Sequence, residues 1–351
     1  MSHIIKSKEI GIFSDIHIGL GQDSSVWHKI VLDFSKWVRE VYTDLGINDI
    51  IIPGDIFHNR SEISVNTLTI AKEFFDNLKD FRIFISAGNH DCYYKDRSDV
   101  NSLSLLKGWS NIVVVDKTPL LIESKGKKIS LIPWGTSVED IPEADICFGH
   151  FEIQTFKMNS YKVCDHGMES TSLLEKSPLV FSGHFHTKDE RSYKKGKIIY
   201  VGSPYQQNFG DVDQIRGIYT FNTETNNLNF IENEKSPKHI KIFLTKLKNK
   251  EQDASFIKEN IPNNIVSLVI DEELDNDKLI ALSTKLQTFN PVYFRTEYKQ
   301  IDADGVDNLS NADYNVVDVE KNIEDFVNSM DIDHKEDVIN YLNSIYKELS
   351  V

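Results

Sequence analysis

The chain has 351 residues, of which 40% are hydrophobic and 26% are charged, and its formal net charge is −15. This composition excludes a wholly disordered or collagen-like chain, and the length predicts about two domains. The longest apolar runs, such as Ile112–Val115, fall far short of the roughly 20 residues that cross a membrane. The N-terminus shows no signal-peptide pattern before a strand-like run at Ile10, so we expect a cytoplasmic protein without a membrane segment.

The negative charge is concentrated at the C-terminus. Residues 301–351 contain thirteen acidic and three basic residues, so the first 300 residues carry a net charge of only −5. The stretch 235–250 contains six lysines and no acid. These lysines suit a solvated strand face or a phosphate-binding face, and a nucleic-acid substrate remains compatible with the charge. Three cysteines without a C-x-x-C pair predict buried thiols rather than disulfides or a zinc site.

Short apolar runs alternate with amphipathic ones from residue 9 onward. Residues 9–13, 50–52 and 81–86 are strand-like, and residues 26–45 and 65–78 have helical periodicity between them. This β-α-β-α-β order predicts parallel strands in an α/β sheet that is covered on both faces. Seven more strand candidates predict a second, stacked sheet; they span residues 112–115, 120–123, 129–133, 146–148, 179–182, 198–201 and 217–221.

The pattern changes after residue 234 and divides the chain into further segments. We predict a catalytic domain over 1–234, a small α+β domain over 235–299, an acidic linker over 300–315 and a helical segment over 316–351. The last segment shows two amphipathic helices, which either fold back on the core or bind a partner; we favour the partner. The predicted docking residues are Ile323, Phe326, Leu342, Ile345 and Leu349.

Polar motifs follow the predicted strands directly. They read Asp-Ile-His-Ile-Gly at 15–19, Gly-Asp-Ile-Phe-His at 54–58, Gly-Asn-His-Asp at 88–91, Gly-His at 149–150 and Gly-His-Phe-His at 183–186. Ligands of open α/β sheets bind at the carboxyl ends of the strands, so these five motifs can meet in one cleft. Any one of these histidines alone would more often be structural, but five ordered motifs make chance a poor explanation.

The side chains in these motifs predict a site for two divalent ions. Oxygen and imidazole donors without thiolates suit Mn²⁺, Fe²⁺ or Zn²⁺ and do not choose among them. Such an ion pair would leave a positive field that attracts phosphate. We assign Asp15, His17 and His186 to one ion, Asn89, His150 and His184 to the other, and Asp55 to both as a bridge.

Three further residues are candidates for the chemistry. His90 follows the predicted ligand Asn89, so we expect its ring to stabilise the transition state or to protonate the leaving oxygen. Asp91 is expected to hydrogen-bond the His90 ring and to orient it. His58 is a weaker candidate for contact with a substrate phosphate. His3, His28, His166 and His239 lack such a context, and we expect structural roles for them.

The series SDIHIG, GDIFH, GNHD, GHF and GHFH resembles the signature of the calcineurin-like metallophosphoesterases. Within that superfamily the chain is most similar to the SbcD-type DNA repair nucleases, and among them to the recombination endonuclease subunits of T-even-type bacteriophages. Further stretches carry this resemblance: LIPW at 131–134, GHFHT at 183–187, YVGSPYQ at 200–206 and RGIYTFNTET at 216–225.

The resemblance implies a two-sheet α/β/β/α sandwich, with residues 235–299 as a capping domain and C-terminal helices that dock on a coiled-coil ABC ATPase of the SbcC type. It implies cleavage of DNA phosphodiester bonds, as exonuclease and endonuclease, with two Mn²⁺ ions; Mg²⁺, Fe²⁺ and Zn²⁺ are alternatives. The family's seven ligands and its catalytic histidine map onto the residues assigned above. A homodimer within a heterotetramer is also implied, in the host cytoplasm if the protein is phage-encoded.

Two alternatives share this site. Protein phosphatases of the superfamily carry Asp-Arg-Gly soon after the second motif, whereas Ile56, Phe57 and His58 follow Asp55 here, which disfavours a phosphatase. A phosphodiesterase for small nucleotides remains an alternative enzyme. A scaffold that binds metal only for stability is the non-enzymatic alternative, and the presence of all expected ligands and of His90 argues against it.

Overall fold

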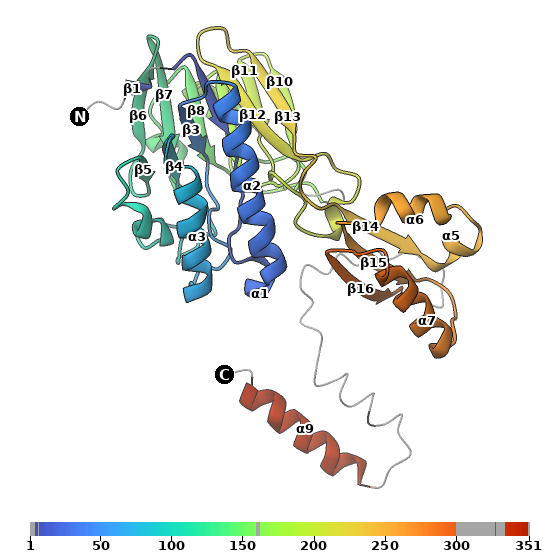
Figure 1. The fold of residues 1–351 in the computed structure, drawn as a ribbon. Helices are drawn as coiled ribbons and strands as arrows, with labels where there is room; N and C mark the ends of the chain where they lie inside the picture. The colour runs from blue at the N-terminus through green and yellow to red at the C-terminus, as the bar shows by residue number, and fades with distance from the viewer. Residues whose placement is uncertain (1–3, 6, 159–161, 300–326, 328–333, 350–351) are drawn as a thin grey trace. The chain divides into compact units, whose positions relative to one another are not determined.

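The computed structural model describes residues 4–5, 7–158, 162–299, 327 and 334–349, with side chains up to Ser344 in the last range. Contacts between residues divide the chain into two compact units, Met1–Gln300 and Ile301–Val351. The first unit contains three sheets (Figure 1). Within the described residues, no helix is long and apolar enough to span a membrane.

The first large sheet has six strands in the order β13-β12-β2-β3-β4-β5. Strands β2 to β5 run parallel, and β12 and β13 extend the sheet with antiparallel pairs. The parallel part confirms the predicted crossover order. The bounds are β2 Glu9–Ile12, β3 Asp49–Ile52, β4 Arg82–Ser86, β5 Ile112–Val115, β12 Gly217–Asn222 and β13 Leu228–Glu232.

The second large sheet has seven strands in the order β1-β6-β7-β8-β9-β11-β10. Its centre, β7-β8-β9-β11, is parallel, whereas β6 pairs with β7 and β10 pairs with β11 in antiparallel fashion. The bounds are β1 Ile4–Ile5, β6 Leu120–Ser124, β7 Lys127–Ile132, β8 Ile146–His150, β9 Leu179–Gly183, β10 Asp189–Tyr193 and β11 Gly196–Tyr200.

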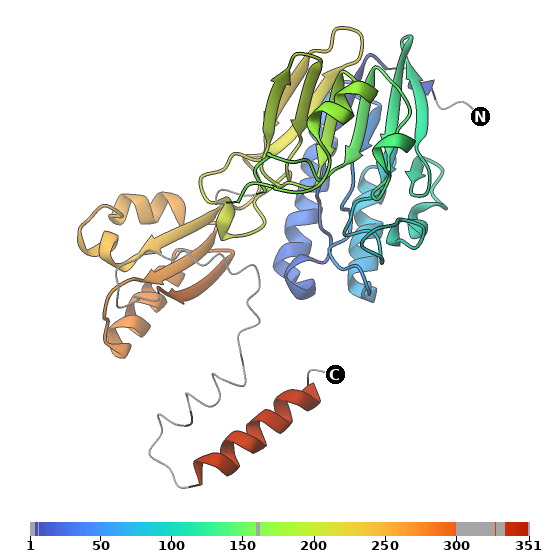
Figure 2. The same cartoon turned by 180° about the vertical axis from the view of Figure 1, so that it is seen from behind.

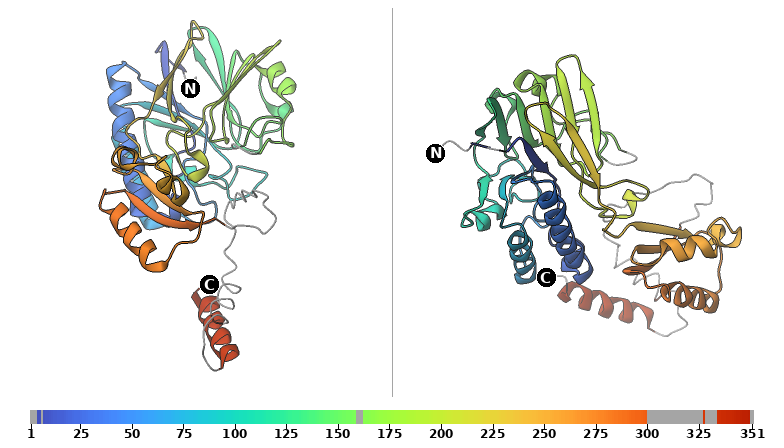
Figure 3. Two further views of the ribbon diagram at one scale, coloured as in Figure 1. Left: turned by 90° about the vertical axis from the view of Figure 1, so that its right-hand side faces the viewer. Right: turned by 45° about the horizontal axis from the view of Figure 1, so that its top comes forward.

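The two sheets stack, and helices cover their outer faces, as the sandwich prediction requires (Figures 2 and 3). Side chains along β3 point alternately to the two faces of the sheet. Ile50 and Ile52 face the helices, and pack in one cluster with residues of α2 (Ser25–Asp44) and α3 (Val65–Asn77). Ile51 packs between the sheets, in the cluster that contains Phe148. Helix α4 (Ser170–Lys176) contributes to a third cluster beside the seven-stranded sheet. All three cysteines are buried and unpaired.

A third sheet lies in the segment predicted as the small second domain. Its strands β14 (His239–Phe243), β15 (Ile265–Ile270) and β16 (Tyr293–Tyr298) pair in parallel. Helices α5 (Leu244–Lys248), α6 (Ala254–Asn260) and α7 (Asn276–Gln287) connect them and share a separate apolar cluster. Strands and helices therefore alternate here, whereas α+β was expected. The boundaries of this domain stay a prediction, since contacts group it with the large sheets in one unit.

Helix α9 (Lys335–Leu349) occupies the position of the second predicted C-terminal helix. Of the predicted docking residues, Leu342 lies in this helix with a described side chain. Ile323 and Phe326 lie outside the described residues, and so do the side chains of Ile345 and Leu349. The docking surface therefore stays a prediction.

His239 begins β14 and packs against two elements of the larger sheets' domain. Its ring stacks on Trp27 of α2 at a centroid distance of 6.0 Å and meets the edge of Phe209 at 4.7 Å. Its backbone N–H donates to the side-chain oxygen of Gln206 at 2.6 Å. Burial lowers the pKa of His239 to about 4. The neutral ring is thus part of the contact between the third sheet and the rest of the unit.

This burial predicts a pH-dependent stability. Unfolding exposes His239, whose pKa then returns to about 6.5, so the unfolded state takes up a proton first as the pH falls. The contribution of His239 is complete above pH 6.5 and decreases toward pH 4, by about 2 kcal/mol between pH 7 and pH 5. Urea unfolding at both pH values should show that His239→Phe loses less stability than the wild type. Parallel losses would contradict this account.

Candidate metal centre

The predicted site residues lie where five strands end. Asp15 follows β2, Asp55 follows β3 and Asn89 follows β4, so the six-stranded sheet supplies three of them. His150 ends β8 and His184 follows β9 in the seven-stranded sheet. The site therefore takes residues from both stacked sheets, as the strand-end rule led us to expect.

The first predicted ligand group comes together. The donor atoms of Asp15, His17 and His186 lie within 4.8 Å of one another, and the Nε2 atoms of the two histidines are 3.1 Å apart. Asp15 Oδ2 is buried and has no hydrogen-bond partner among the described residues. A buried carboxylate oxygen without a partner is costly unless a cation or a proton compensates it.

The second predicted group converges on the amide oxygen of Asn89. His150 Nε2 and His184 Nδ1 each lie 2.9 Å from Asn89 Oδ1. The remaining ring nitrogen of His150 is 2.8 Å from the carbonyl oxygen of Pro53. Because that carbonyl can only accept, it places a proton on Nδ1 and leaves Nε2 directed at the site.

Asp55 lies between the two groups. Its Oδ2 is 3.5 Å from His17 Nε2 and 3.3 Å from His150 Nε2. The donor atoms of Asp15, Asp55 and His150 also lie within 4.8 Å of one another. One oxygen of Asp55 therefore faces a residue of each predicted group, which is the position that a bridging carboxylate needs.

The backbone at the site is strained. Asp15, His17, Asp55 and His184 have φ angles of 57°, 52°, 55° and 88°, in the left-handed region that non-glycine residues adopt at a cost of about 1–2 kcal/mol each. Gly88 permits the close approach of the loops after β3 and β4, because a Cβ there would clash with the side chain and backbone of Asp55. Such strain gathered in one place is typical of functional sites.

Burial and charge determine which groups carry protons. Burial lowers the pKa of His17, His184 and His186, in His186 to about 4, so these rings are neutral near pH 7 and have a lone pair to offer. Burial raises the pKa of Asp15 to about 7. Burial opposes the charged form of His150 as well, but the Asp55 carboxylate outweighs it and raises the pKa of His150 to about 9.

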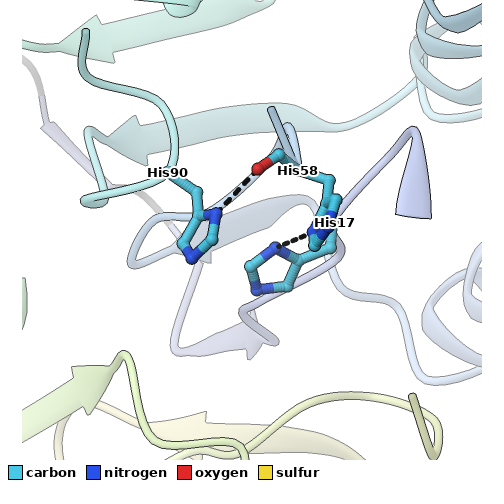
Figure 4. Close-up of side chains that lie close together, drawn as sticks. All are labelled: His17, His58 and His90. Carbon is cyan, nitrogen blue, oxygen red and sulfur yellow. Dashed lines mark hydrogen bonds between the residues drawn. The ribbon is translucent and has the colours of Figure 1, made fainter. Parts of the chain in front are cut away.

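His90 and His58 lie beside His17 (Figure 4). His90 Nδ1 is 2.7 Å from the carbonyl oxygen of His58, which must accept, so the Nδ1 carries a proton and Nε2 remains for other contacts. The His58 ring stacks on His90 at 5.6 Å, and its Nδ1 is 3.4 Å from His17 Nδ1. Burial lowers the pKa of His58 to about 4. The predicted roles of both residues stay predictions.

Asp91 does not orient the His90 ring, contrary to our expectation. Its Oδ1 accepts from the backbone N–H groups of Ile56 and Phe57 at 3.0 Å, and its Oδ2 accepts from those of Asp55 at 2.9 Å and Gly88 at 3.0 Å. The His58 carbonyl is the partner of the ring instead. Asp91 therefore ties the loop after β3 to the loop after β4, and its effect on chemistry passes through the backbone.

The donor set fits divalent metal ions. Two carboxylates, an amide oxygen and imidazoles are the ligands that Mn²⁺, Fe²⁺ and Zn²⁺ accept, once His150 has lost its second proton. The unpartnered Asp15 oxygen is compensated by either a cation or a proton.

Comparison with known proteins decides the family. The family model for calcineurin-like phosphoesterases matches residues 8–188, just over half of the chain. The chain belongs to this family. Its members are hydrolases that use divalent metal ions, and the predicted resemblance is thereby confirmed. The match covers all five motifs and ends just beyond His186.

Two curated proteins are similar to this phosphoesterase. Exonuclease subunit 1 of Enterobacteria phage T4 is 35% identical over 231 residues, which is 62% of this chain and 66% of that protein. The phosphoesterase 078R of Invertebrate iridescent virus 3 is 27% identical over 194 residues, which is 50% of this chain and 53% of that protein. The alignment thus spans just under two thirds of the first relative and about half of the second.

The structure adds residues that sequence reasoning missed. The Glu152 carboxylate lies 3.4 Å from His184 Nε2, and the Trp134 ring lies 5.3 Å from the His184 ring. Gln207 donates its side-chain N–H to the Asp15 carbonyl at 2.6 Å. Of these three, Glu152 is the one that sequence reasoning could have considered, because it is an acidic residue two positions after His150, the end of β8.

If Asp15 and His150 are ligands, their protonation predicts pH-dependent metal binding by this phosphoesterase. Both groups must lose a proton to act as ligands, and in the metal-free protein their pKa values are about 7 and about 9. We therefore expect Mn²⁺ binding to tighten as the pH rises from 6 to 9 and to release protons at pH 7. Calorimetry in buffers of different ionisation enthalpy measures both effects. Affinity that does not change over this range would contradict the assignment of these two ligands.

Proposed function

We propose that the protein is a metal-dependent DNA nuclease subunit, with exonuclease and endonuclease activity in recombination, repair or replication. The observation that carries this proposal is the 35% identity to a phage exonuclease subunit, in an alignment of 231 residues. The Asp55-bridged arrangement of two ligand groups supports the phosphodiesterase chemistry. On this proposal residues 1–234 form the catalytic domain and residues 235–299 the capping domain.

The proposed ligands are the seven residues assigned from the sequence. Asp15, His17 and His186 would hold one ion and Asn89, His150 and His184 the other, with Asp55 shared. Two such ions, Mn²⁺ by resemblance to the SbcD-type nucleases, would supply Lewis-acid activation of water and of the phosphate. Two aspartates reduce the charge of two divalent ions only in part, so an anionic phosphodiester is attracted to the site.

His90 is the proposed catalytic residue. The His58 carbonyl accepts from His90 Nδ1 and thereby orients the ring, while the His17 ring stands 4.7 Å away. A second proton on Nε2 would let His90 donate to the leaving oxygen of the cleaved strand. Asp91 acts in this proposal only through the backbone, by fixing the loop that carries His90.

Replacement of His90 tests whether this residue acts in the hydrolysis step and not in metal binding. We expect His90→Ala to reduce DNA hydrolysis about 10²- to 10⁴-fold, the usual range for loss of an acid–base group, with unchanged Mn²⁺ stoichiometry. The loss should be smaller for bis(p-nitrophenyl) phosphate, whose leaving group needs no proton. His334→Ala, at an exposed position, serves as the control. Equal losses on both substrates would contradict the leaving-group role.

A substrate panel tests the proposed function against its alternatives. Purified protein with Mn²⁺ should hydrolyse duplex DNA and a DNA hairpin, and should leave a phosphopeptide and a cyclic nucleotide intact. Hydrolysis of the phosphopeptide or the cyclic nucleotide without DNA cleavage would favour a phosphatase or a small-nucleotide phosphodiesterase. Metal binding without any hydrolysis would favour the scaffold alternative.

The phage relative is named as a subunit of an exonuclease, which supports a partner protein. We propose a coiled-coil ABC ATPase of the SbcC type, docked on the C-terminal helices, with two copies of each chain in the assembly. The docking residues are those assigned from the sequence, of which Leu342 lies in α9. The host cytoplasm is the proposed place of action if a phage encodes the protein.

Leu342→Asp tests the docking surface. A charge on the apolar face of α9 should abolish co-purification with a co-expressed SbcC-type ATPase and leave the nuclease activity of the isolated protein unchanged. Asn340→Asp is the matched control, because it adds the same charge to an exposed polar position of the same helix. Unchanged co-purification of Leu342→Asp would refute the assignment.

A further inference from the structure

Glu152 links a predicted ligand to a loop that the family motifs do not include. Its Oε1 lies 3.4 Å from His184 Nε2 and 3.1 Å from His166 Nε2. The other ring nitrogen of His184 is the one that faces Asn89. His166, which we expected to be merely structural, in turn lies 2.8 Å from Asp165. Glu152 thus stands on the side of His184 away from the candidate metal centre.

The backbone of Glu152 is held on both sides by one buried hydroxyl. The Tyr200 hydroxyl donates to the carbonyl of Phe151 at 2.9 Å and accepts from the N–H of Ile153 at 3.2 Å. The carbonyl of Glu152 accepts from the N–H of Met168 at 2.7 Å. Phe151 and Ile153 are buried in an apolar cluster. The carboxylate therefore extends from a fixed backbone, so its contact with His184 costs little conformational entropy.

The loop that begins at Glu152 turns back toward this residue at Gly167, whose backbone is in the left-handed region. Gly167 has a φ of 86°, and a Cβ at this position would clash with the Glu152 backbone. Backbone hydrogen bonds join the two described arms of this loop, 151–158 and 162–168, from Gln154 to Met168 and from Thr155 to Cys164. This turn of the loop brings the His166 ring to the Glu152 carboxylate.

The chemistry of the contact decides the tautomer of His184. The two ring nitrogens of His184 both face acceptors, the Glu152 carboxylate at Nε2 and the Asn89 amide oxygen at Nδ1. A charged carboxylate is the stronger acceptor of the two, so it draws the single proton of the neutral ring to Nε2. A glutamate side chain with its ordinary pKa of about 4.3 is ionised near pH 7. A neutral imidazole with a proton on Nε2 has its lone pair on Nδ1. Nδ1 and Asn89 Oδ1, 2.9 Å apart, are then two electron-pair donors on the same side of the ring, and the second ion is proposed to bind beside both of them.

We propose that Glu152 is a positioning residue that holds His184 in the Nε2-protonated form, with the Nδ1 lone pair directed at the second proposed metal position. This inference rests on the proposed function and extends it by one residue outside the motifs. Carboxylates that orient metal-binding histidines typically change metal affinity 10- to 100-fold when they are removed. Glu152 is expected to act on one ion of the pair, because its contact is to His184 alone among the predicted ligands.

Two measurements test the proposal. Nitrogen-15 NMR of the histidine rings in the metal-free wild-type protein reports the tautomer directly, with His184→Asn to assign the signal. Calorimetric titration with Mn²⁺ then gives the affinities of the two positions for wild type, Glu152→Ala, Glu152→Gln and Glu169→Gln. Glu169 is the matched control, since it is an exposed carboxylate just beyond the same loop. Circular dichroism and thermal melts confirm that each variant is folded.

We expect an Nε2-protonated His184 in the wild type and its loss in Glu152→Ala. One of the two Mn²⁺ affinities should fall 10- to 100-fold in Glu152→Ala and less in Glu152→Gln, whose amide oxygen still accepts, with no change in Glu169→Gln. An Nδ1-protonated His184 in the wild type, or unchanged affinities in Glu152→Ala, would overturn the proposal. DNA hydrolysis by the wild type is assayed separately, so failure of the nuclease function is distinguished from failure of this inference.

Discussion

The candidate centre depends on the stacking of two sheets whose strands end in the same region. Asp15, Asp55 and Asn89 come from one sheet and His150 and His184 from the other, so the apolar layer between the sheets determines how far apart the donors lie. The contacts of Asp55 with His17 at 3.5 Å and His150 at 3.3 Å are the result. Each ligand group takes residues from both sheets, so a change in that layer would move the donors apart within each group.

Much of this arrangement could be predicted from the sequence, for a physical reason. Parallel strands are buried on both faces, so runs such as Ile50–Ile52 stand out, and the polar residues directly after them must lie at the sheet's carboxyl edge. Asp15 and His17 do come together, but through left-handed backbone at both residues rather than through the alternation of an extended strand. The order of strands within the sheets could not be predicted, since it depends on pairing between distant segments such as β1 and β6.

The errors arose where a partner lies nearby in space and far away in the sequence. Asp91 is adjacent to His90 in the chain, which suggested a side-chain pair, but its oxygens instead meet amides of residues 55–57, more than thirty positions earlier. Glu152 and His184 are likewise 32 positions apart. The small domain shows the same limit, because its helices and strands were expected but the parallel pairing that makes it α/β was not.

The four amide contacts of Asp91 also bear on how quickly ions enter. They join the loops after β3 and β4 through the protein's own hydrogen bonds, so the shape of this part of the centre does not depend on a bound cation. Little chain rearrangement is then required during loading. The speed of loading would be governed by how readily the hydrated ion sheds its water, a step at which Mg²⁺ is slow, rather than by folding of the loops.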